Sequence, residues 1–167
     1  MVPHDLIGYF TTSSAVAGTL IGLLFVSISL RYEAIFGESA DFRSRAIAGA
    51  GFTALVNALS LSLWALIPRV NLGFPAVVLA IFCLVSTLRR HMGKLAERGS
   101  SRTLLLLSVF VYLSQLVNGG LLVARPHSVA TVYSLVYTLF AAFAAALIRS
   151  WQLLQPVRDG NEATTVG

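Results

Sequence analysis

The chain has 167 residues, of which 56% are hydrophobic and only 11% are charged. A soluble domain normally carries about 25% charged residues, so this chain has too little polar surface to fold in water. Its mean hydropathy of +0.79 indicates a membrane protein instead. The net charge of +5 comes from cations at the ends of apolar runs. Such cations suit anionic lipid headgroups and leave no basic face for nucleic acid, which we exclude as a partner.

The start of the chain and its single cysteine narrow the class further. The opening MVPHDLIGYF carries one acid and no Lys or Arg, unlike the basic start of a secretory signal, so we expect the first apolar run to be retained. Cys83 lies inside an apolar run. A lone cysteine excludes a disulfide within the chain and a zinc site of the Cys-x-x-Cys kind.

Long apolar runs alternate with shorter polar segments along the sequence. About 20 helical residues cross a hydrocarbon core of about 30 Å, so these runs predict an all-α integral membrane helical bundle with about five transmembrane helices. The third run is the shortest and is at the lower limit for crossing. We expect one domain, residues 1–167, with spans at residues 7–30, 46–67, 72–88, 103–124 and 129–148 and a disordered cytoplasmic tail at residues 150–167.

The distribution of cations predicts the orientation. If successive segments alternate between the two sides of the membrane, ten Lys and Arg residues lie on one side and two on the other. Five of the ten lie in the segment from Arg89 to Arg102, RRHMGKLAERGSSR. Because cation-rich loops stay in the cytoplasm, we expect the N-terminus outside and the C-terminus inside.

The reactive residues are few and scattered. No Asp, Glu, Lys, Arg or His lies within an expected span, although such residues usually mark proton relays and ion-coupled transporters. The histidines are His4, His91 and His127, at ends or in loops. The acids Glu33, Glu38 and Asp41 fit no EF-hand spacing, and no G-x-S-x-G frame occurs. We therefore expect no enzyme, no catalytic residue, no metal site and no cofactor.

Uncharged polar side chains within the second and fourth spans are the candidate site. Asn57 and Gln115 lie near the middle of their spans, at similar depth, so the two amides could face each other or a shared interior. Gly49, Thr53, Asn57, Ser60 and Trp64 share one face of the second span, and Ser108, Tyr112, Gln115 and Gly119 share one stripe of the fourth, with Asn118 beside it. These groups either hydrogen-bond between helices or line a wet path for an ion or small solute.

Small residues mark one stripe of the first span, with Ser14, Gly18 and Gly22 near its centre. Packing replaces hydrophobicity as the driving force between helices in lipid, and small residues let two backbones approach closely. We expect this stripe to pack against another helix, either within the chain or at a subunit interface.

The same span resembles the opening of a family of small, uncharacterised actinobacterial multispan membrane proteins. Their first span reads roughly A-G-x-x-x-G-L-x-F-V-x-x-S, and this chain matches at Ala17, Gly18, Gly22, Leu23, Phe25, Val26 and Ser29. The resemblance implies a bacterial plasma (inner) membrane and adds no site residue. Some relatives are labelled automatically as modulators of a membrane-bound ATP-dependent protease, which implies a larger membrane partner.

Two functions agree with these features. The first is a small homo-oligomeric membrane protein that acts as a pore or channel and passes an ion or small solute along polar paths between helices. The alternative is a non-catalytic accessory or regulatory subunit that binds a larger membrane partner such as a protease. Both place the protein in the lipid bilayer.

Overall fold

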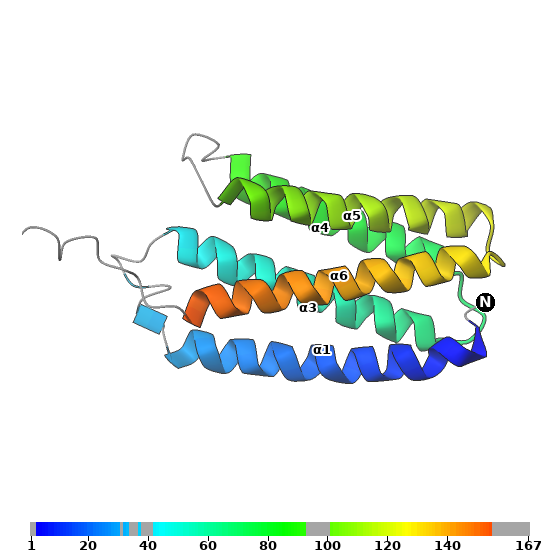
Figure 1. Cartoon of the computed structure of the whole chain (residues 1–167), viewed down its shortest axis with the longest axis horizontal. Coiled ribbons are helices and arrows are strands. Elements are labelled where there is room, and N and C mark those ends of the chain that lie inside the picture. Colours follow the sequence, from blue (N-terminus) through cyan, green and yellow to red (C-terminus); the bar gives the residue numbers. More distant parts are fainter. Residues whose placement is uncertain (1–2, 31, 34–36, 38–41, 93–100, 155–167) are drawn as a thin grey trace, which may run out of the picture.

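The computed structural model describes residues 3–30, 32–33, 37, 42–92 and 101–154, and within them it contains helices and no strand. Successive helices run in opposite directions along one axis (Figure 1). They are α1 (His4–Leu30), α3 (Phe42–Leu66), α4 (Gly73–Met92), α5 (Ser101–Ala124) and α6 (Val129–Leu154). The expected all-α membrane bundle is confirmed.

Four helices are long and apolar enough to cross a membrane, over His4–Leu30, Ile47–Leu66, Leu105–Ala124 and Val129–Trp151. The apolar part of α4, Gly73–Arg89, is shorter, as the third run of the sequence suggests. Helix α6 continues to Leu154, beyond the expected end of the fifth span at residue 148. The rest of the expected tail, residues 155–167, and residues 93–100 of the basic segment lie outside the described residues.

Local sequence signals set where the helices begin. The Asn71 side-chain oxygen accepts a hydrogen bond from the amide of Gly73 at 2.9 Å, which caps the start of α4. Pro75 follows in the first turn, where its missing amide proton leaves no helical bond unmade. Helix α6 begins after Ser128, whose hydroxyl lies 2.7 Å from the hydroxyl of Thr131.

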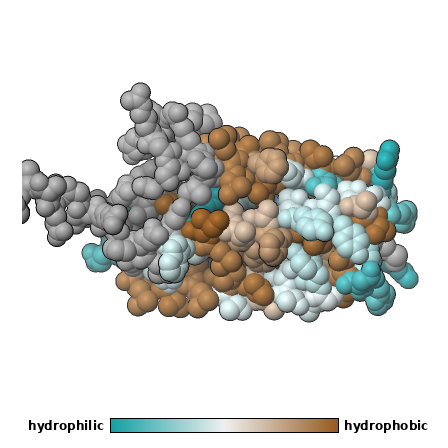
Figure 2. Space-filling model, in the orientation of Figure 1, coloured by the Kyte–Doolittle hydropathy of each residue, from teal (hydrophilic) through white to brown (hydrophobic). Residues whose placement is uncertain are grey.

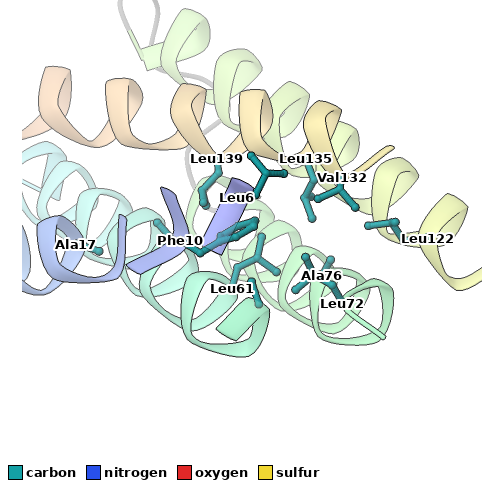
Figure 3. Close-up of a cluster of buried hydrophobic side chains, with 12 residues drawn as sticks. Leu6, Phe10, Ala17, Leu61, Leu72, Ala76, Leu122, Val132, Leu135 and Leu139 are labelled. Atoms are coloured by element: carbon teal, nitrogen blue, oxygen red, sulfur yellow. The ribbon is translucent and has the colours of Figure 1, made fainter. Parts of the chain in front are cut away.

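The helices form two layers, with α4 and α5 as a hairpin on one side and α3 and α6 beside it (Figure 1). Helix α1 lies at the edge, where it packs chiefly against α3 and only slightly against α6. A large apolar cluster at the N-terminal end of the bundle, where α1 begins, joins all these helices (Figure 3). Phe10 of α1 and Leu135 of α6 are fully buried in it. This end is therefore closed by hydrocarbon side chains.

Glycines let α4 and α5 approach closely. A Cβ atom built on Gly73 would lie 2.6 Å from the backbone nitrogen of Val123 and 2.7 Å from the carbonyl oxygen of Gly119. A Cβ atom on Gly119 would lie 3.0 Å from the backbone nitrogen of Val77. These distances leave no room for a side chain, so the two helices are joined backbone to backbone.

The small stripe of the first span does not pack within the chain, contrary to one of the two expectations. Gly18 and Gly22 are exposed, and no atom lies within 4 Å of a Cβ atom built on either. Ser14 is half-buried, and its hydroxyl donates to the carbonyl of Thr11 at 2.8 Å. Another face of α1 is the one buried: Leu6, Phe10, Ser13, Ala17 and Leu24. That face packs against the neighbouring helices, so the stripe of small residues faces outward.

The close contact between α4 and α5 predicts that Gly73→Ala destabilises the protein by about 2 kcal/mol, because overpacking that cannot relax typically costs 1–3 kcal/mol. The new methyl group would overlap backbone atoms of α5, which cannot rotate away. The measurement is the free energy of unfolding in detergent. Gly120→Ala is the control, since Gly120 is exposed with no atom within 4 Å of its built Cβ. Equal stabilities for the two variants would contradict the close approach.

Candidate functional site

The predicted stripe of the fourth span is the buried face of α5. Its polar members are nearly inaccessible: Ser108 is 4% exposed, Tyr112 2%, Gln115 1% and Asn118 9%. The opposite face carries large apolar residues that are exposed: Leu106, Phe110, Leu113, Val117 and Leu121. Helix α5 is therefore polar inside and apolar outside, the arrangement expected of a helix surrounded by lipid and other helices.

Asn57 and Gln115 form a reciprocal pair of hydrogen bonds. The side-chain nitrogen of Asn57 donates to Gln115 Oε1 at 2.7 Å, and Gln115 Nε2 donates to Asn57 Oδ1 at 3.1 Å. Gln115 Nε2 also lies 3.2 Å from the carbonyl oxygen of Ala76. Both amides are 1% exposed. The two side chains expected to meet do so, and they tie α3, α5 and α4 together.

The depth of this pair follows from the helix bounds. Asn57 and Gln115 each lie nine residues before the last residue of their helices, α3 and α5, which end on the same side of the bundle. At 1.5 Å per residue this is about 13 Å, close to the middle of a hydrocarbon core of about 30 Å. Since water is scarce at that depth, two amides that satisfy each other avoid a large desolvation penalty.

The other candidate residues bond differently. The Thr53 hydroxyl donates to the carbonyl of Gly49 at 2.8 Å, and the Asn118 amide donates to the carbonyl of Ser114 at 2.8 Å, so each has a partner in its own helix. Ser60 is only half-buried. The structure therefore places Thr53 and Asn118 in the interior and joins Asn57 and Gln115 as a side-chain pair.

Arg149 is a buried residue that the sequence prediction placed just outside the fifth span. It is 4% exposed, within α6. One guanidinium nitrogen, Nη2, donates to the hydroxyl of Ser108, and the other, Nη1, lies 3.4 Å from the carbonyl oxygen of Ala50. Arg149 thus connects α6 with α5 and α3. The apolar stretch of α6 extends to Trp151, past the expected end of the fifth span at residue 148, and includes Arg149.

A signal for this burial is present in the sequence. The inward positions of α6 recur every three or four residues at Thr138, Ala142 and Ala145, and the next position in that series is Arg149. The periodicity therefore points the arginine inward, whereas the charge alone suggests the end of the span. Alanines on this face, and the buried Gly51 of α3, leave space for the long side chain.

Together these groups form what we name the polar seam: Asn57, Gln115, Ser108 and Arg149, between the α4–α5 hairpin and the α3–α6 layer. Ala50 and Ser108 each lie sixteen residues before the end of their helices, two turns further from the N-terminal end than the amide pair. The two levels are therefore about 10 Å apart along the bundle. The seam offers neutral hydrogen-bonding groups at one level and a guanidinium at the other.

The part of the chain that the structure describes contains no group of three or more His, Cys, Asp or Glu residues that could hold a metal ion. An antiparallel bundle with apolar outer faces and a polar interior seam defines an all-α membrane protein. Comparison of the chain with family models, curated proteins and solved structures found no match.

The amide pair predicts coupled losses of stability. Asn57→Leu and Gln115→Leu should each lower the free energy of unfolding by about 1–2 kcal/mol, because each leaves a buried amide without its partner. Gln115→Leu should cost more, since it also removes the contact with Ala76. The double variant should lose less than the sum of the two, with a coupling energy of about 1 kcal/mol.

Asn118→Leu is the control for this double-mutant cycle. Its amide bonds to its own helix, so its effect should add to that of Asn57→Leu without coupling. Unfolding by denaturant in detergent micelles gives the free energy of unfolding of each variant. Simple additivity of Asn57→Leu and Gln115→Leu would show that the pair contributes nothing as a pair.

Proposed function

We propose that this protein is a small homo-oligomeric bundle of a bacterial plasma (inner) membrane that passes an ion or small solute along the polar seam. The observation that carries the proposal is that buried polar side chains of α3, α5 and α6 meet at one interface, at two successive levels. Uncharged polar groups can replace part of the water around a solute that is losing its hydration.

The seam is closed in the structure at the level of the amides, because Asn57 and Gln115 bond to each other. Interhelical hydrogen bonds in membranes average only about 0.6 kcal/mol, so a solute that offers the same bonds can replace them at low cost. The N-terminal end is closed by the apolar cluster around Phe10 and Leu135. Apolar constrictions of this kind gate by excluding water.

The two layers also suggest how the seam opens. Gly73 and Gly119 join α4 and α5 backbone to backbone, so this hairpin can move as one body. Its contacts with α3 and α6 include the hydrogen bonds of the seam. A small displacement of the hairpin would separate the amides without disturbing the packing of α4 on α5.

The orientation completes this proposal. Ten cations on one side and two on the other favour a C-terminus in the cytoplasm. The level of Arg149 and Ser108 then lies toward the cytoplasm, and the apolar cluster lies toward the outside. A solute would thus meet hydrocarbon at one end, amides in the middle and a guanidinium at the other end.

Flux through liposomes tests the seam. The purified protein should pass a small ion or solute, and Gln115→Leu should reduce the rate by about tenfold or more, because leucine removes the polar contact that stabilises a dehydrated solute by at least 1.4 kcal/mol. The control is Phe110→Leu on the exposed face of the same helix, which should leave the rate unchanged. Protein that is folded and inserted, yet passes no ion or solute under any gradient, would rule out this function.

The outer face of α1 favours a second candidate, a non-catalytic accessory subunit. Between residues 8 and 22 it exposes small and hydroxyl residues: Gly8, Thr11, Thr12, Ala15, Gly18, Thr19 and Gly22. Paler, more polar residues lie along this part of the surface in Figure 2, whereas the surface along α5 is apolar. The exposed hydroxyls of Thr11 and Thr19 donate to carbonyls of their own helix at 3.0 Å, so lipid tolerates them.

Such a face suits close contact with another helix. We propose that it binds either a second copy of this chain or a larger membrane partner. A protease of the kind implied by the family resemblance would be one such partner. If the face binds a second copy, the solute-passing protein is an oligomer. If it binds a larger partner, the chain regulates that partner.

Gly22→Leu should weaken assembly without unfolding the chain, since its side chain would project from the outer face into open space. Gly120→Leu is the matched control, because Gly120 is also exposed and unobstructed but lies on α5. Light scattering of the purified protein gives its oligomeric state, and affinity purification from membranes identifies the partners that it binds. If the wild type is monomeric and the Gly22→Leu variant no longer co-purifies with a partner, the accessory role is favoured. If Gly22→Leu and Gly120→Leu have the same oligomeric state and the same partners, the outer face of α1 is not the binding surface.

A further inference from the structure

The buried face of α5 changes from polar to apolar toward the N-terminal end of the bundle. Ser108, Gln115 and Leu122 follow one another at intervals of seven residues, or about two helical turns, so they lie on one face of α5. Ser108 and Gln115 belong to the polar seam, whereas Leu122 is buried in the apolar cluster. The seam therefore ends in hydrocarbon about 10 Å beyond the amides.

Leucines from three helices close this end of the seam. Leu61 of α3 and Leu135 of α6 lie in the same cluster as Leu122 of α5 (Figure 3). The cluster adjoins the amide pair, because its member Ala76 provides the carbonyl oxygen that lies 3.2 Å from Gln115 Nε2. A solute that leaves the amides toward this end would meet the leucines next.

One serine hydroxyl lies among these apolar side chains. Ser62 of α3 is fully buried, and Ala58 and Ala65, one turn before and one turn after it, both belong to the apolar cluster. Its hydroxyl oxygen has no hydrogen-bond partner in the part of the chain that the structure describes. Ser27 and Ser150, by contrast, donate to carbonyls one turn earlier in their own helices. Ser62 is therefore a buried polar group that still has a hydrogen bond to gain.

This hydroxyl and the leucines have opposite effects on water that enters the cluster. A buried polar group without a partner raises the free energy of the state that contains it. Water beside Ser62 would supply the bond and remove this penalty. Apolar side chains oppose the same water, since a hydrophobic constriction excludes it. The balance between Ser62 and the leucines thus sets how often this end of the seam is wet.

We propose that Ser62, Leu61, Leu122 and Leu135 form a gate that opens when water enters the apolar cluster and hydrogen-bonds to Ser62. This inference rests on the proposed solute-passing function and adds how the path is regulated. The leucines hold the gate dry and closed, and Ser62 lowers the free energy of its wet, open state relative to the closed one.

Ser62→Ala tests the hydroxyl with a residue that suits both a helix and an apolar core. The melting temperature in detergent should rise by about 2 °C or more, because the closed state loses an unsatisfied group. The flux rate in liposomes should fall by about fivefold, because water no longer gains a partner at the gate. Ser27→Ala is the control and should leave the flux rate unchanged, since that exposed hydroxyl bonds to Leu23 of its own helix at 2.9 Å.

Leu61→Asn tests the apolar part of the gate. It should raise the flux rate by about tenfold, because an amide among the leucines attracts water. The matched control is Leu55→Asn. Leu55 is also on α3 and also 1% exposed, but it packs with Leu24 of α1 in a different cluster. A similar rise in both variants would mean that any buried amide loosens the bundle, and it would overturn the gate.

The outcomes separate the gate from the function on which it rests. Folded wild-type protein that passes no ion or solute overturns the solute-passing function, and the gate with it. Wild-type flux that Ser62→Ala leaves unchanged or increases overturns the gate alone. A lower melting temperature for Ser62→Ala would show that the hydroxyl is already bonded in the closed state, which also overturns its role. A higher melting temperature together with slower flux supports the gate, because a role in packing alone gives no such opposite changes.

Discussion

A hydrocarbon solvent offers no hydrogen bonds, and this constraint explains where the polar side chains of the bundle lie. Helices satisfy their own backbones, and the hydroxyls of Thr11, Thr19 and Thr53 donate to carbonyls one turn earlier. Amides and guanidinium groups cannot be satisfied so completely within one helix. Asn57, Gln115 and Arg149 therefore bond across helices, and their need for partners determines which faces of α3, α5 and α6 meet.

This constraint gives the interfaces of the bundle different characters. Helix α1 meets α3 through leucine and alanine side chains, and α4 meets α5 through glycine backbones. Between the two layers, hydrogen bonds take the place of part of the apolar packing. Contacts of this kind are directional and can be exchanged for contacts to a solute, whereas close backbone packing cannot. The solute path that we propose therefore follows the seam, between the hairpin and the layer that contains the α1–α3 pair.

The sequence could predict the features that depend on a single helix or on the depth of a residue along its span. Run lengths predicted the helices, and the equal depth of Asn57 and Gln115 predicted that their amides meet. The stripe of Gly18 and Gly22 was harder to place, because its orientation depends on which face of α1 packs against α3. Arg149 was missed because its charge suggested the end of a span, although its place in the α6 periodicity indicated burial. The close approach at Gly73 needed the position of a second helix.

The length of α4 has a consequence for the surrounding membrane. Its apolar stretch has 17 residues, which span about 26 Å, several ångströms less than a typical hydrocarbon core. If α4 crosses the membrane, lipids beside its exposed face, which includes Val78 and Phe82, would shorten or tilt their chains to match it. This deformation costs energy in proportion to its perimeter, and two copies that share one thinned patch reduce that perimeter. In a bilayer of typical thickness this mismatch would favour thinner regions of the membrane around α4 and would assist the proposed self-association along that helix.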